Sequence, residues 1–288
     1  MRDNYSITEL CQALGVSSSG YYEWLCKPKN MRFQQNEKLL QEINLIHSHR
    51  HTRCYGSPRM RRELQRRGYP CSENRVARIM RINGLWARPR RPYRPKTTRV
   101  DHAAHPSPNL LTLPETPPPK TPGLQIVSDI TYIPTLEGWL YLAIVVDLYT
   151  RMILGWKLAD SLHAPIITDT LQRALNSGLI APNAIFHSDR GSQYSATSTR
   201  ELIKKAGLRQ SMSAAGNCYD NAYAESFFAS IKSELPGSSD PFPSKQAARS
   251  AIFDYLETFY NQKRLHSSLG YLSPNEFLNQ HVKNHSLN

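Results

Sequence analysis

Three acidic residues stand inside or beside stretches that otherwise read as structural elements. Asp129 interrupts an apolar run, Asp189 follows another, and Glu225 lies within a predicted helix; 59 residues separate the first two acids and 35 the second two. Carboxylates that meet at one point cannot all stay ionised without a cation, and Mg²⁺ or Mn²⁺ prefers oxygen ligands. Two such ions about 4 Å apart stabilise the entering and leaving oxygens of an in-line phosphoryl displacement. The trio therefore predicts metal-dependent phosphoryl transfer if the fold brings it together.

The elements after residue 122 must position these acids. Residue patterning predicts strands over 124–135, 139–150, 151–159, 183–188 and 208–213, and helices over 164–177, 197–206, 221–235 and 244–262. Short connections between the first three strands predict an antiparallel meander, and the order of elements predicts a mixed α/β sheet with helices on its faces. In this topology the first and fourth strands can lie side by side, so Asp129 can meet Asp189. A helix crossing the same sheet edge can supply Glu225.

The segments around these acids resemble a known family. The 35-residue gap is typical of the Asp-Asp-Glu core of retroviral integrases and many bacterial transposases. The segments SDITYI, HSDRGSQYS, GNCYDNAYAESFFASIKSE and YNQKRLHSSLGYLSP resemble the second-frame transposases of the insertion-sequence-three group, and YGSPRMRRELQRRGY resembles the helix-turn-helix region that precedes their core. The resemblance implies a ribonuclease H-like integrase core, with a mixed five-stranded sheet, preceded by a small basic helical domain.

The resemblance also implies an activity. Members of the group cut one strand at each end of an insertion element and join the 3′-OH to a target phosphate. They use Mg²⁺, for which Mn²⁺ substitutes, and they work as multimers on double-stranded DNA. By this resemblance Asp129 would bridge both metal ions, Asp189 would hold one, and Glu225 would hold the other.

Three further residues receive a role from the same resemblance. Lys232 follows Glu225 by seven residues, so both lie on one helix face, and Lys232 would contact the DNA end. His187 and Asn217 would either support the metal ligands or contact DNA. A first-frame protein is a possible partner, because in this group it usually supplies an end-binding helix-turn-helix and a coiled coil after frameshift fusion. The chain is thus expected to act alone or as one part of such a fusion.

The positive charge of the chain is concentrated in one segment. The chain has 36 Lys and Arg against 23 Asp and Glu, and residues 27–100 hold 20 of these bases and four of the acids. Such a cluster binds polyphosphates with release of counterions, which favours double-stranded DNA as the partner over a merely solvated basic surface. The residues expected to contact DNA lie on predicted helices and are Arg61, Arg62, Arg66, Arg67, Arg75, Arg78 and Arg81.

The chain is expected to comprise four regions. Residues 1–33 contain a helix-turn-helix pattern over 7–25, which either contacts DNA or is an ordinary helical hairpin. Residues 34–100 form the basic domain, with helices over 34–50, 55–68 and 72–84. The proline-rich residues 101–122 are expected to form a linker. Residues 123–284 form the catalytic core and its C-terminal helices.

Other conspicuous polar residues have simpler explanations. Asp147, at the end of the second strand, is either a fourth active-site acid or a structural residue, and pairing with Arg151 or stabilisation of a turn is the favoured expectation. Asp220 is expected to cap the helix that follows it. The segment HSHRHTRC over 47–54 suggests zinc, but it lacks a C-x-x-C, so a polar helix end is the simpler expectation.

Composition narrows the class of protein. A chain of 288 residues with 40% apolar residues can form two or three domains. No stretch approaches the roughly 20 apolar residues that span a bilayer, the N-terminus lacks a signal core, and the five scattered cysteines suit a reducing cytosol. We expect a cytoplasmic, nucleoid-associated bacterial protein with no membrane partner. The alternatives are a catalytically inactive DNA-binding regulator and a hydrolase of RNA–DNA hybrids; the intact trio and the basic domain argue against them.

Overall fold

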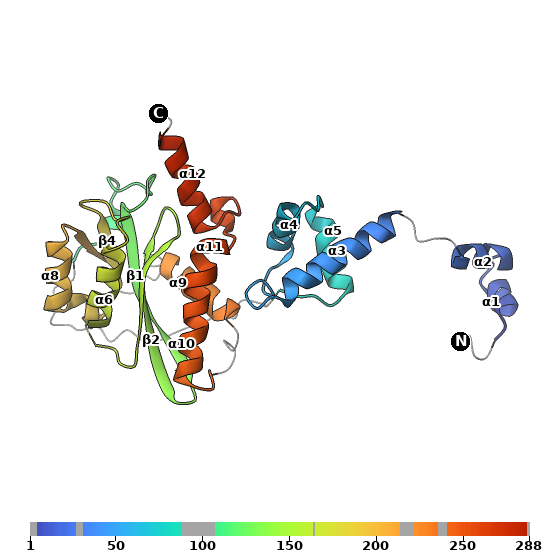
Figure 1. Ribbon diagram of the computed structural model, residues 1–288, viewed down its shortest axis with the longest axis horizontal. Coiled ribbons are helices and arrows are strands. Elements are labelled where there is room, and N and C mark those ends of the chain that lie inside the picture. Colours follow the sequence, from blue (N-terminus) through green and yellow to red (C-terminus); the bar gives the residue numbers. More distant parts are fainter. Residues whose placement is uncertain are drawn as a thin grey trace. The chain divides into compact units, whose positions relative to one another are not determined.

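The computed structural model describes residues 5–26, 31–87, 107–163, 165–213, 222–235 and 241–286, without the side chains of 222–225 and 286. The chain forms two compact units (Figure 1). The first comprises Met1–His49 and Gly56–Trp86, and the second comprises Arg50–Tyr55 and Ala87–Asn288. In the described ranges, no helix is both long and apolar enough to cross a membrane.

The first unit begins with a helix pair. Helices α1 (Ile7–Ala13) and α2 (Ser18–Cys26) are separated by a turn in which Gly15 has φ +65°. A reciprocal capping box begins α1, because the Ser6 hydroxyl accepts a hydrogen bond from the Glu9 backbone N–H and the Glu9 carboxylate accepts one from that of Ser6. The predicted helix–turn–helix pattern over 7–25 is therefore present as two helices.

Three more helices of the first unit share an apolar core. They are α3 (Met31–Ser48), α4 (Ser57–Arg66) and α5 (Glu73–Ile82). Ser72 caps α5 by accepting a hydrogen bond from the Arg75 backbone N–H, as its residue type predicts. The buried apolar residues recur at helical spacing, which places them on the inner faces: Leu39, Ile43, Ile46, Met60, Leu64, Val76, Ile79 and Met80.

A five-stranded mixed sheet organises the second unit. Its strands are β1 (Gln125–Thr135), β2 (Gly138–Asp147), β3 (Ile153–Ala159), β4 (Ile185–Ser188) and β5 (Arg209–Met212), in the order β3-β2-β1-β4-β5. β1, β2 and β3 pair antiparallel, whereas β4 pairs parallel with both β1 and β5. The sequence-based prediction that the first and fourth strands are neighbours is confirmed.

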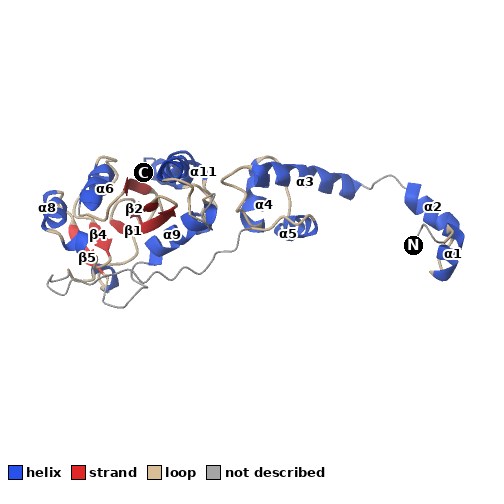
Figure 2. Ribbon diagram, turned by 90° about the horizontal axis from the view of Figure 1, so that it is seen from below, coloured by secondary structure: helices blue, strands red, loops and turns tan. Residues whose placement is uncertain are grey.

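Helices cover both faces of this sheet (Figure 2). One layer contains α6 (Pro165–Leu175), α7 (Ser192–Ser195) and α8 (Thr197–Lys205), and the other contains α9 (Ala222–Glu234) and α10 (Lys245–Phe253). Helices α11 (Asn261–Lys263) and α12 (Pro274–Ser286) follow along the chain, and Leu278 of α12 packs against the apolar cluster on the α6 side. On the α6 side, Ile126, Val145 and Phe186 of the sheet pack in one apolar cluster with Leu171 of α6 and Ile203 of α8. On the other side α9 and α10 contact β1.

The proline-rich stretch contacts the sheet in its described part. Residues 110–112 form a short 3₁₀ helix. The Leu110 N–H donates to the Ser211 hydroxyl over 2.9 Å, and the Met212 N–H donates to the Pro108 carbonyl over 3.3 Å. Residues 107–112 therefore extend the core along its β5 edge, where proline composition alone predicted a linker.

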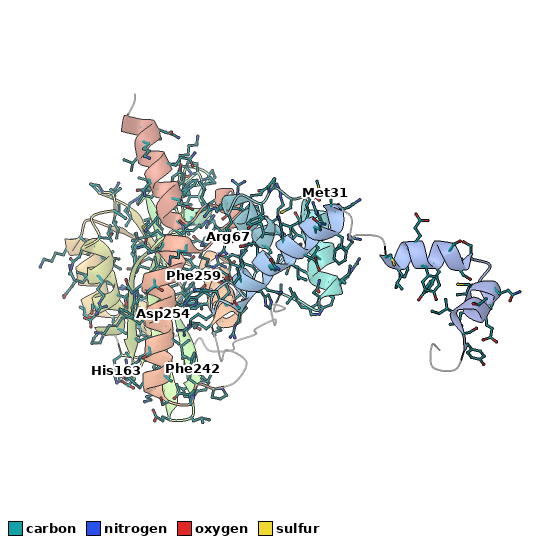
Figure 3. The ribbon with its side chains drawn as sticks, turned by 45° about the vertical axis from the view of Figure 1, so that its right-hand side comes forward. Met31, Arg67, His163, Phe242, Asp254 and Phe259 are labelled. Carbon is teal, nitrogen blue, oxygen red and sulfur yellow. The ribbon has the colours of Figure 1, made fainter. Side chains whose placement is uncertain are left out.

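The long helix predicted over 244–262 is not a uniform α-helix. It is α-helical in α10, π-helical over Asp254–Tyr260 and α-helical again in α11. Asp254 and Phe259, which Figure 3 labels, lie on the π-helical stretch. π-Helical turns arise where tertiary contacts override the i→i−4 pattern, and hydrophobic periodicity does not reveal them.

Candidate active site

The register of two parallel strands brings Asp129 and Asp189 to one place. Val127 of β1 pairs with His187 of β4, and the two strands are parallel. Asp129 and Asp189 each follow two residues later, so they lie at matching positions. Side chains alternate across a strand, which puts Asp129 on the same sheet face as Val127. β4 ends at Ser188, and Asp189 begins the turn that follows. The carboxylate of Asp189, at the end of β4, therefore lies beside the carboxylate-bearing position 129 of β1.

The turn after β4 holds the Asp189 carboxylate in place. Its Oδ1 accepts a hydrogen bond from the Gly191 backbone N–H over 2.9 Å. A β-carbon at Gly191 would lie 3.0 Å from that same oxygen, so glycine leaves room for the close approach. Burial raises the pKa of Asp189, and the Gly191 hydrogen bond partly opposes this. A buried carboxylate whose ionisation is disfavoured gains from a nearby cation.

Tyr194 lies near both aspartates, on the side of β1 that carries Ser128. Its ring is buried, and its hydroxyl lies 3.1 Å from the hydroxyl of Ser128, the residue before Asp129. Burial raises the pKa of Tyr194 well above its usual value, and the charges of both Asp129 and Asp189 raise it further. The charges of both carboxylates therefore act on one buried hydroxyl. Sequence analysis missed this residue, whose only signal was an aromatic residue five positions after Asp189.

Helix α9 brings a cation to the same place. Lys232 is largely buried; burial lowers its pKa to about 8, while the negative charge of Asp129 works in the opposite direction. This coupling puts Lys232 within electrostatic reach of Asp129. Glu225 lies seven residues earlier on α9, but its side chain is outside the described part of the structure. Strand register thus places Asp129 beside Asp189, and the charge of Asp129 acts on Lys232.

His187 is fully buried and supports the strand end. Its Nδ1 lies 2.8 Å from the Ser211 hydroxyl, and its Nε2 lies 3.2 Å from that of Ser213. A side chain with no exposed surface cannot contact DNA in this conformation, so of its two expected roles the structure favours the supporting one. Asn217 and Asp220 lie outside the described residues.

The seven arginines expected to contact DNA differ in exposure and in their partners. Arg62, Arg66, Arg67, Arg78 and Arg81 are exposed, and Arg61 and Arg75 are half-buried. Arg67 contacts the carboxylates of Glu42 and Glu63 at 3.4 and 3.2 Å, and Arg75 donates to the Asn36 side chain over 2.8 Å. A guanidinium that already contacts a carboxylate or an amide is less free to bind phosphate. Arg67 and Arg75 are therefore weaker candidates for DNA contact than their residue type alone predicted.

The other polar residues singled out in the sequence have structural partners. Asp147 is buried and stabilises a turn, because its carboxylate accepts hydrogen bonds from the N–H groups of Thr150 and Gly123 at 2.8 and 2.9 Å. His51 Nε2 lies 2.7 Å from the Asp254 carboxylate, and its ring stacks on Phe259. These contacts account for Asp147 as a turn residue and for His51 as part of a packed polar cluster.

The donor set at the sheet edge fits a hard divalent cation. Two aspartate carboxylates supply oxygen ligands, and the charge of Asp129 acts on the ammonium group of Lys232. Within the described side chains, no group of three or more His, Cys, Asp or Glu residues could hold a metal ion. A third carboxylate at this place would have to come from outside that set, where Glu225 stands.

Comparisons with known proteins agree with this arrangement. Models of the integrase core domain match residues 119–218 and 206–274, and a model of an HTH-like domain matches 34–93. The fold and the paired aspartates thus define a protein of the integrase-core class. Transposase InsF for insertion sequence IS3A, from Escherichia coli (strain K12), is 38% identical over 281 residues, which are 96% of each chain. The chain belongs to this family of insertion-sequence-three transposases and is a DNA transposase.

Two further proteins show the range of the similarity. The insertion element IS600 uncharacterized 31 kDa protein of Shigella sonnei is 40% identical over 268 residues, which cover 93% of this chain and 97% of that protein. The HTLV-2 integrase catalytic core domain, solved in complex with magnesium, shares 14% identity over 55% of this chain and 98% of its own, with a TM-score of 0.40.

Proposed function

We propose that this transposase cuts DNA at the ends of its insertion element and joins the resulting 3′-OH to target DNA at the site formed by Asp129, Asp189 and Glu225. The observation that carries the proposal is the register of β1 and β4, which aligns two aspartates where β4 ends beside β1. Bound Mg²⁺ would supply an acidic water and charge stabilisation for an in-line phosphoryl displacement. Asp129, Asp189 and Glu225 would hold it.

The chain's own residues prepare the site for a polyanion. The Gly191 N–H fixes one oxygen of Asp189, so the carboxylate needs little reorganisation on binding. Lys232 carries a positive charge near Asp129 at neutral pH, where it would neutralise a backbone phosphate beside the scissile bond. The exposed arginines of the first unit would hold the flanking duplex through its phosphates. A homo-oligomer on DNA and a first-frame partner remain part of this proposal.

Charge-removing, shape-preserving substitutions test the assignment. Asp129→Asn, Asp189→Asn and Glu225→Gln should each lower Mg²⁺-dependent strand cleavage and joining by several orders of magnitude, because each removes a ligand charge while keeping its size. Folding and binding of duplex DNA should persist. Cleavage and joining of an oligonucleotide that carries an element end would be measured for each variant.

The control is Asp169→Asn, at a half-exposed aspartate of α6 that pairs with Lys157. This variant should cleave and join at the wild-type rate. Near-normal joining by any variant of the trio would remove that residue from the site. A catalytically inactive DNA-binding regulator would behave like the three variants of the trio, because it would bind duplex DNA without cleaving or joining it.

A further inference from the structure

A buried ion pair anchors the end of α9 to the C-terminal helices. The guanidinium of Arg264 donates to both carboxylate oxygens of Glu234, with Nε–Oε2 at 2.7 Å and Nη2–Oε1 at 2.6 Å. The two side chains are only 3% and 4% exposed. This two-bond geometry fixes direction as well as distance. Arg264 and its neighbours belong to the YNQKRLHSSLGYLSP segment, to which the site described above assigns no role.

Other side chains complete this polar network. The Tyr255 hydroxyl donates to Glu234 Oε2 over 2.7 Å, and Arg264 Nη1 lies 3.1 Å from Nε2 of His266. The Arg264 guanidinium also lies over the Tyr260 ring, 5.5 Å from its centroid. Burial alone would lower the pKa of Arg264, but the Glu234 carboxylate more than offsets this and the pKa is raised. Arg264 therefore stays positively charged inside the protein.

Stability alone does not explain the pair. Glu234 is the last residue of α9, where the helix dipole disfavours a negative charge. Desolvating two charges roughly cancels their attraction, so apolar side chains of similar volume are often equally stable at such a position. What the pair adds is directional: two parallel hydrogen bonds set the rotation of the helix and its position along its own axis.

The two faces of α9 have different tasks. Phe227 packs edge-on against Tyr260 with ring centroids 5.1 Å apart, and Glu234 follows Phe227 by seven residues, on the same face. Lys232 is coupled to Asp129. Position 225 precedes Glu234 by nine residues, or about 900° of rotation, which puts it on the opposite face. The face with Phe227 and Glu234 thus contacts the C-terminal helices, whereas the face with positions 225 and 232 is directed to Asp129 of β1.

We propose that Glu234 and Arg264 are positioning residues, which hold α9 at the rotation and axial position that place residues 225 and 232 beside Asp129. The inference rests on the proposed function, since it concerns the geometry of that same site. A displacement of about 1 Å at a reacting centre costs about 100-fold in rate. A helix held only by apolar contacts can slide or turn by that amount.

A double substitution separates positioning from stability. Glu234→Met combined with Arg264→Met removes both charges and keeps an apolar, filled site, so the protein should fold and bind duplex DNA as the wild type does. Mg²⁺-dependent joining should fall about 100-fold. Hydrogen exchange of the α9 amides, measured by mass spectrometry on the full chain without metal, should become faster.

The matched control removes a different ion pair. Asp160→Asn combined with Arg249→Met eliminates a half-exposed ion pair between Asp160, the residue after β3, and Arg249 of α10. It should leave both joining and α9 exchange unchanged. Wild-type joining or wild-type α9 exchange in the Glu234→Met/Arg264→Met protein would overturn the positioning role.

A conservative variant covers the case in which the double substitution fails to fold. Arg264→Lys keeps the charge but loses the planar fork, so joining should fall about 10-fold and α9 exchange should rise; unchanged values of either would overturn the inference. The proposed function fails by a different result, namely a wild-type chain that does not join DNA or an active Asp129→Asn. In that event the exchange of α9 amides still tests whether the pair holds the helix.

Discussion

The charged groups to which function is assigned lie at different depths in the two units. In the second unit the Asp189 carboxylate and the Lys232 ammonium are largely buried. Burial raises the pKa of Asp189 and lowers the pKa of Lys232, so it favours the neutral form of each group. In the first unit Arg62, Arg78 and Arg81 are exposed. Buried groups act at fixed positions, whereas exposed cations on helices attract a polyanion with little geometric demand.

This difference separates two functional requirements. Phosphoryl transfer needs ligands placed within fractions of an ångström, so the core fixes its carboxylates through strand register and a turn hydrogen bond. Holding duplex DNA needs mainly the number and spacing of positive charges. Substitutions in the two units should therefore fail in different ways: those in the core should abolish joining without affecting binding, and those in the basic unit should weaken binding in proportion to the charge removed.

The largest effect that sharpens this comparison is the salt dependence of DNA binding. If the basic segment contacts six to ten phosphates, affinity of the full chain for duplex DNA should fall about 10³–10⁵-fold between 50 and 200 mM salt. The logarithm of the binding constant would be measured against that of the salt concentration. Asp129→Asn should give the same slope as the wild type. A flat line would show that the 20 bases of residues 27–100 serve something other than phosphate.

Much of the core was predictable because its signals are local. The apolar strands after residue 122 and the short turns between the first three of them indicated the meander. A parallel return to the β1 side of that meander then put β4 beside β1, and Asp129 and Asp189 stand at matching positions along these two strand directions. The convergence of two acids therefore followed from strand order, without knowledge of any side-chain contact.

The features that sequence reasoning missed depend on contacts between distant residues. The Tyr194 hydroxyl reaches Ser128, 66 residues away, and Arg264 reaches Glu234, 30 residues away. Arg67 resembles its neighbours in sequence, and only the packing of α3 on α4 shows that it meets Glu42. Residue type gives the capacity to bond, but the partner is chosen by tertiary structure.

Lys232 provides the next test, because it is a buried cation that would bind DNA. Lys232→Ala should lower capture and joining of the DNA end about 10- to 100-fold, the usual loss for a charge-assisted bond of about 1.5–3 kcal/mol. Burial lowers the pKa of Lys232 to about 8, so its positive charge is present at pH 7 and mostly lost at pH 9. Binding of the element end by the metal-free chain should weaken across this range.

Lys232→Arg is the control for this pH effect. An arginine stays protonated throughout the range, so binding by this variant should not change between pH 7 and pH 9. Binding would be measured by fluorescence anisotropy at constant ionic strength. Equal pH profiles for the wild type and Lys232→Arg would mean that another group titrates, and wild-type joining by Lys232→Ala would mean that this residue has no part in end capture.

The smallest expected effect divides the arginines of the basic unit. Arg62 of α4 and Arg67, the residue after α4, are both exposed, but Arg67 contacts the carboxylates of Glu42 and Glu63. Arg62→Ala should remove one phosphate contact, which lowers the salt slope by about 0.9 and leaves stability unchanged. Arg67→Ala should leave the slope unchanged and cost about 0.2–1 kcal/mol of unfolding free energy, the usual worth of exposed ion pairs. Salt titrations and urea unfolding of the two variants would show the division, and equal slopes would mean that contact with carboxylates does not decide which arginines hold DNA.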